Sequence, residues 1–179
     1  MEHLPRWAGS AWAVGALAVL FLEAIVRLGG RGLTTLASGL SALEAAAMTA
    51  LTLLFAYGEG YRALHRHFVP NVLARLARLP PPGQLSFTRW LLAPFYALGL
   101  AHVDGPSLRR GWASVAAIVL AIVVVRALPE PWRGIVDASV AVALSIGLLS
   151  LVGRFAMSLR AAAPQRELGD GAHLGEREG

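Results

Sequence analysis

The chain has 179 residues, of which 56% are hydrophobic and 15% are charged. This is too apolar for an ordinary soluble domain, in which about a quarter of the residues are charged, and it indicates an integral membrane protein. The formal net charge is +5, but the arginines cluster beside apolar runs, so we expect lipid headgroups and not nucleic acid as their partners. The absence of cysteine excludes disulfides, thiolate metal sites and cysteine-ligated iron–sulfur clusters.

Four apolar runs are long enough to cross a bilayer as helices, which takes about 20 residues. They cover residues 7–26, 33–57, 111–128 and 132–152. A fifth run, 90–103, has only fourteen residues and contains a proline. The sequence therefore predicts an all-α membrane protein with a single membrane domain over 1–163. The polar tail 164–179 has no apolar periodicity, and we expect it to be disordered.

The arginines indicate whether the fifth run crosses the membrane. If it does not cross, twelve arginines lie on the side of both termini and four on the other side; if it crosses, the split is eight and eight. Because arginine is enriched in cytoplasmic loops, this favours four transmembrane helices with both termini in the cytoplasm. Residues 58–110 are then a cytoplasmic-side segment, with amphipathic helices and an interfacial or re-entrant stretch at 90–103.

Three acidic residues lie within or beside the predicted spans, where an unpaired charge is costly: Glu23, Glu44 and Asp137. Glu23 and Asp137 each have an arginine four positions away, so we expect both near the outer interface as anchors paired within one helix or between helices. Glu44 has no arginine within four positions. It is predicted about eleven residues into the second span, roughly 16 Å deep and near the midplane.

At that depth, desolvation would keep the Glu44 carboxyl protonated. Three roles are then open: a neutral group that hydrogen-bonds to another helix, a proton or cation relay, or a polar contact to a partner protein. The candidates for a proton or ion pathway are Glu44, Glu23 and Asp137.

Small residues recur every four positions in two of the predicted spans. Ser139, Ala143 and Gly147 do so in the fourth span, and Ala11 and Gly15 in the first. Small side chains at this spacing let membrane helices approach closely, so both stripes predict helix packing. Self-association and packing within one chain fit the pattern equally well.

The stretch YGEGYRALHRHF, residues 57–68, follows the second span and concentrates charge. With an α-helical period it forms an amphipathic helix, on which Glu59 can pair with Arg62 three positions on. Its two histidines fall on opposite flanks, too far apart to chelate one metal from a single helix. We predict that these residues join two from the end of the fifth run in an interfacial polar belt: Glu59, Arg62, His65, Arg66, His67, His102 and Asp104.

Histidines from different segments, such as His65 and His102, leave open a haem or metal site. We expect histidines that face solvent or lipid phosphate instead, and no cofactor or bound metal.

Three stretches carry a resemblance: EGYRAL at 59–64, LLAPFYALGLAH at 91–102 and LPEPWRGIVDASVAVALSIGLLSL at 128–151. Together they resemble an uncharacterised group of small polytopic inner-membrane proteins of bacteria. The resemblance implies a location in the bacterial inner (cytoplasmic) membrane, and it implies no function.

No catalytic triad, phosphate-binding loop or pair of carboxylates at enzyme spacing is visible, so we do not expect an enzyme. The expected function is that of a small helical bundle acting through helix–helix contacts, as a homo-oligomer or as an accessory subunit of a membrane complex. A proton or ion pathway through Glu44 is the first alternative, and a haem- or metal-binding membrane protein is the second.

Overall fold

The computed structural model describes residues 8–78, 87–100 and 105–162, and within these ranges it is helical without strands. The predicted tail, His102 and Asp104 lie outside the described residues. In chain order the elements are α1 (Ala8–Ala37), α2 (Ala42–Phe55), the π-helix η1 (Ala56–Phe68), α3 (Val69–Leu76), α4 (Phe87–Leu91), α5 (Ala93–Ala97), α6 (Gly105–Arg126) and α7 (Trp132–Ala162).

Three helices in the described part are long and apolar enough to cross a membrane: Ala8–Ala37, Leu108–Arg126 and Trp132–Arg160. This agrees with the prediction of an all-α, multi-pass membrane protein. The predicted second span, 33–57, is not one helix. Its first residues belong to α1, a turn follows in which Gly39 has a φ of +85°, and a new helix begins at Ala42.

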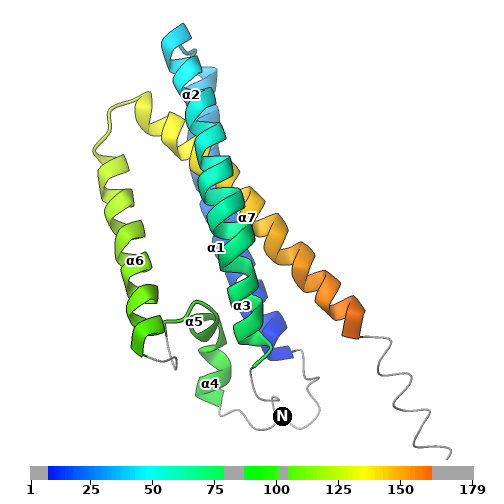
Figure 1. The fold of residues 1–179 in the computed structure, drawn as a ribbon. Helices are drawn as coiled ribbons and strands as arrows, with labels where there is room; N and C mark the ends of the chain where they lie inside the picture. The colour runs from blue at the N-terminus through cyan, green and yellow to red at the C-terminus, as the bar shows by residue number, and fades with distance from the viewer. Residues whose placement is uncertain (1–7, 79–86, 101–104, 163–179) are drawn as a thin grey trace, which may run out of the picture.

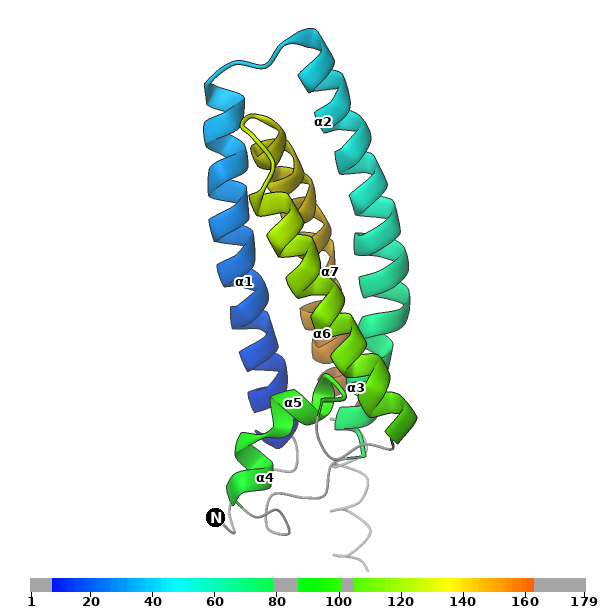
Figure 2. The ribbon, with the colours of Figure 1, turned by 90° about the vertical axis from the view of Figure 1, so that its left-hand side faces the viewer.

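The helices run alternately up and down (Figure 1). α1 leads away from the end of the bundle near the N-terminus, α2, η1 and α3 return as one continuous rod, α6 leads away again and α7 returns. α7 packs against α1 and against the α2–η1–α3 rod, and so lies at the centre of a three-helix bundle. In Figure 1 α6 stands apart from this three-helix bundle, and in Figure 2, turned by 90°, it lies in front of α7.

A hydrophobic core holds the end of the bundle where α3 stops. α4 and α5 lie at this end, which we call the base (Figure 1). Arg75 fixes α5 there, because its Nη1 donates a hydrogen bond of 3.1 Å to the carbonyl oxygen of Ala97. The buried residues come from α1, α3, α5 and α7: Ala13, Val14, Leu17, Val69, Val72, Leu76, Ala93, Ala97 and Leu151.

At the opposite end, α1 and α7 cross with their backbones close together. A Cβ added to Gly32 would lie 2.5 Å from the Cβ of Ala138, and one added to Gly134 would overlap the side chain of Thr35. A glycine inside a helix costs about 1 kcal/mol relative to alanine. Here that cost is offset by the packing that the close approach allows, which explains why α1 continues through its glycines to Ala37.

The stripe of Ser139, Ala143 and Gly147 packs within the chain, against α2 and η1. The hydroxyl oxygens of Ser139 and Thr52 lie 3.2 Å apart, and a Cβ on Gly147 would lie 2.6 Å from Leu64 Cδ1. The second predicted stripe behaves differently. Gly15 faces open space, so Ala11 and Gly15 do not form a close helix contact in this chain, because α1 packs through the neighbouring face that carries Ala13, Val14 and Leu17.

Candidate functional site

Glu44 lies at the start of a helix and not in its middle. The backbone N–H and the hydroxyl of Ser41 both donate to Glu44 Oε2 at 2.8 Å, and the Glu44 N–H donates back to Ser41 Oγ at 3.4 Å. This is a capping box, in which the Ser41 N–H holds the pKa of Glu44 below its usual value. The predicted position eleven residues into a span is wrong, because the helix begins at Ala42.

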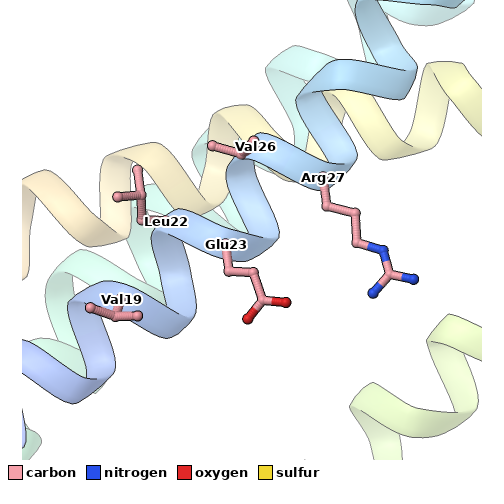
Figure 3. A pocket seen from close by; sticks show the side chains of 5 residues that line it. All are labelled: Val19, Leu22, Glu23, Val26 and Arg27. Carbon is pink, nitrogen blue, oxygen red and sulfur yellow. The ribbon is translucent and has the colours of Figure 1, made fainter.

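Glu23 occupies the middle position instead. It is the sixteenth of the thirty residues of α1, and not close to the helix end as expected, because α1 continues to Ala37. Glu23 and Arg27 are both exposed, and with three apolar neighbours they line an open groove of about 390 Å³ (Figure 3): Val19, Leu22 and Val26. Neither side chain forms an ion pair with any described residue, so the expected Glu23–Arg27 pair is not made.

Both charged side chains project from α1 toward the side on which α6 lies (Figure 3). α6 offers them no polar partner, because every residue between Ser114 and Arg126 is apolar. The groove is therefore a charged site with apolar surroundings, which we call the α1 charge groove.

Asp137 forms an interhelical anchor. Its carboxylate lies 3.6 Å from Arg31 Nη1 of α1, and the residue is only 4% exposed. The sequence suggested Arg133 as its partner, but no ion pair to Arg133 is present within the described ranges. Asp137 is therefore paired across the α1–α7 crossing, and it does not line the α1 charge groove.

The π-helix brings Arg66 over Tyr61, five positions before it, which an α-helical period would not. Its hydrogen bonds run from i to i+5, so residues four and five apart come close to alignment. Tyr57 stacks on Tyr61 at 6.1 Å and Tyr61 on His65 at 5.4 Å between ring centroids, while Arg66 lies 5.5 Å from the Tyr61 centroid. The expected ion pair between residues 59 and 62 is absent from the described part of the chain, because positions i and i+3 no longer align.

His65 is held between η1 and α7. Its Nδ1 lies 2.7 Å from Ser150 Oγ, and its Nε2 lies 3.3 Å from Arg154 Nη2. Because a guanidinium only donates, Nε2 must accept, and Nδ1 then carries the proton that is donated to Ser150. Both ring nitrogens of His65 thus contact side chains of α7.

The remaining belt residues form no shared site among the described residues. Glu59, Arg62 and His67 are exposed on η1, and no group of three or more His, Asp or Glu side chains in the described ranges could hold a metal ion. Sequence reasoning missed Arg31, Ser150 and Arg154, whose partners lie on other helices.

A comparison with protein-family models, curated proteins and solved structures finds no match for this chain.

Proposed function

We propose that this chain is a four-crossing membrane protein that acts through helix contacts and assembles as a homo-oligomer by the α1 charge groove. The observation that carries the proposal is the pair of charges, Glu23 and Arg27, left without ion-pair partners in the described chain on a helix apolar enough to cross a membrane. A charge inside a bilayer costs a few kcal/mol unless it is paired. Assembly supplies the pairing.

The α2–η1 rod is the proposed additional crossing. It runs alongside α7 for most of its length, with contacts from Thr52 opposite Ser139 to His65 opposite Ser150. With four crossings, both described ends lie on one side. That side carries the arginines of η1, α3 and the end of α7, and the positive-inside rule favours it as the cytoplasmic side. We propose the bacterial inner membrane as the location, with the base facing the cytoplasm.

A second copy of the chain is the occupant that the charges favour. A twofold axis along the membrane normal brings the same face of two α1 helices together, so that Glu23 of each copy meets Arg27 of the other. The two residues are one helical turn apart, which long side chains bridge. The groove is thus complementary to itself, whereas α6 has no polar side chain between Ser114 and Arg126 with which to cover it.

A reciprocal charge exchange tests the proposal. The full chain is purified in mild detergent or nanodiscs, and its mass is measured by size-exclusion chromatography with light scattering. We expect Glu23→Arg and Arg27→Glu each to convert the oligomer to a monomer, because like charges then face each other. The double variant Glu23→Arg/Arg27→Glu should restore the oligomer, and Glu59→Arg, an exposed acid on η1, serves as the matched control.

A wild-type chain that is monomeric and free of other proteins would overturn the proposal. An accessory subunit gives a different pattern: another membrane protein co-purifies with the wild type, is lost in both single variants and does not return in the double variant. Thermal unfolding of all variants shows whether the fold itself has survived the substitutions.

A proton or ion pathway is the second candidate, and we now propose Glu23 as its acid in place of Glu44. The favouring observation is that Glu23 lies midway along a membrane-length helix with its carboxyl in an open groove. In proteoliposomes, flux driven by a pH gradient should vanish with Glu23→Gln and persist with Glu44→Gln. Equal flux through Glu23→Gln and the wild type would eliminate this candidate, whatever the oligomeric state.

A further inference from the structure

A second groove runs along α7 beside η1, at the level of His65. Its volume is about 500 Å³, and it is open to the surface of the bundle. Its polar members are His65, Ser150 and Arg154, and the rest of the lining comes from α7: Ile146, Leu149, Gly153 and Met157. The groove thus combines one guanidinium with an apolar wall.

Arg154 has most of its hydrogen-bonding capacity unused. A guanidinium carries five N–H donors, and the one bond that Arg154 makes to a described residue goes to His65. No described carboxylate pairs with it. His65 in turn is held by Ser150 and by stacking on Tyr61. None of these contacts is to a carboxylate, so they orient the Arg154 guanidinium without neutralising its charge.

The position of Arg154 along α7 also favours an anionic ligand. It lies toward the base, near the arginine-rich end of the bundle, whereas Ile146 and Leu149 lie one to two turns closer to the middle of the helix. On the cytoplasmic side, anionic lipids are the abundant anions at this depth. A phosphate beside Arg154 would place the acyl chain that follows it along the apolar wall.

We propose that this groove binds an anionic phospholipid, with its phosphate against Arg154 and an acyl chain along Leu149 and Ile146. His65 is a positioning residue that holds the guanidinium through Nε2. The site is separate from the α1 charge groove and does not depend on the oligomeric state, although it does require that the chain be embedded in a membrane.

Native mass spectrometry of the full chain with defined lipids tests the proposal. The probes are phosphatidylglycerol and phosphatidylcholine of identical acyl chains, and affinity is read from the fraction of protein that retains each lipid. We expect wild type to prefer phosphatidylglycerol, and Arg154→Gln to weaken its binding about ten-fold, since a charge-assisted hydrogen bond is lost. Arg62→Gln, an exposed arginine on the same side of the bundle outside the groove, should leave the preference unchanged.

Variants of His65 separate positioning from simple structural support. In His65→Gln the amide oxygen can accept from Arg154, so part of the preference should survive, whereas His65→Leu should lose it. A role confined to stability would lower the melting temperature of both variants without changing the ratio of the two lipid affinities. That result would reduce His65 to a packing residue and remove it from the site.

Three outcomes would overturn the lipid proposal as a whole. Wild type could retain both lipids equally, or Arg154→Gln could keep the full preference. The third outcome is that glycerol phosphate displaces phosphatidylglycerol at equal concentration. Glycerol phosphate has the headgroup chemistry without an acyl chain, so the groove would then be a site for a soluble phosphate.

Discussion

α6 and α7 are similarly apolar, but α7 packs against its neighbours and α6 is largely exposed. Both are long and apolar enough to cross a membrane, yet in the most apolar stretch of α7 39% of the residues are buried, and in that of α6 none is. α7 contacts α1, α2 and η1 along its length. α6 is held near its ends, by the turn into α7 and by Gly111, which closely approaches the carbonyl oxygen of Gly99.

The difference lies in the small and polar residues. α7 presents Gly134, Ser139 and Gly147 to its neighbours, and these allow close backbone approach and a hydrogen bond between helices. The middle of α6 has β-branched residues, alanine and Leu120, with no glycine and no polar side chain between Ser114 and Arg126. Apolarity suits both helices to a bilayer, but α7 also has glycines and a hydroxyl group that contact its neighbours.

The most direct test of this difference in packing is to enlarge one residue in each helix. Gly134→Val should lower the free energy of unfolding by about 3 kcal/mol, because the new side chain overlaps Thr35 at the α1–α7 crossing. Ala117→Val, on the exposed surface of α6, should change it little. Thermal unfolding of both variants in the same detergent measures the difference, and equal midpoints would show that the crossing is not tightly packed.

The contact between α7 and η1 should give the next largest effect. Gly147→Leu collides with Leu64, and we expect a loss of about 2 kcal/mol in the free energy of unfolding, since this neighbour is a flexible side chain and not backbone. Adding Leu64→Ala should recover part of that loss. If the double variant is no more stable than the single one, the two residues do not face each other.

The Arg31–Asp137 ion pair, which joins α1 to α7, gives a third test of the difference between α7 and α6. Arg31→Leu leaves a buried carboxylate without its cation and should cost about 1–2 kcal/mol, less than for a fully buried pair because the Arg31 side chain is 41% exposed. Arg126→Leu in α6 should be close to neutral. In a double-mutant cycle, the double variant Arg31→Leu/Asp137→Leu should be more stable than Arg31→Leu alone; additive losses would mean that the pair contributes nothing.

Much of the helical architecture was predictable from the sequence, because long apolar runs leave few alternatives. The fourth predicted span starts at Trp132, where α7 begins, and the third lies almost wholly within α6. The boundary between the first two spans was not predictable from apolarity. The glycines around Arg31 suggest a loop, and the close approach of Gly32 to Ala138 of α7 is a contact that sequence alone does not reveal.

The candidate site was predicted less well, and for physical reasons. Ser41 and Glu44 form the sequence signature of a capping box, which would have placed the helix start correctly, so that signal was present but missed. The π-helix has no comparable signature, and an α-helical period separates Tyr61 from Arg66, which η1 brings together. Arg154 is unremarkable in sequence because its partner, His65, lies on a different helix.

The smallest expected effect lies at the capping box, away from both compared helices. If side-chain packing holds the bundle, Ser41→Ala should lower the free energy of unfolding by about 1 kcal/mol or less. This is well below the loss expected for Gly134→Val. The effect also has a pH signature. The pKa of Glu44 is lowered in the folded state from its ordinary value of 4.5, so the capping contribution is fully present above that value and is lost as pH falls through the lower, folded-state pKa.

The difference in unfolding midpoint between wild type and Glu44→Gln should therefore be constant from about pH 7 to pH 5 and shrink below pH 4.5. Glu59→Gln, an exposed acid on η1 without an ion pair to any described residue, is the control for general acid effects. A difference that grows on acidification would mean that Glu44 is protonated in the folded state, as a deeply buried carboxyl would be. The capping box would then not be the state of this residue in the membrane.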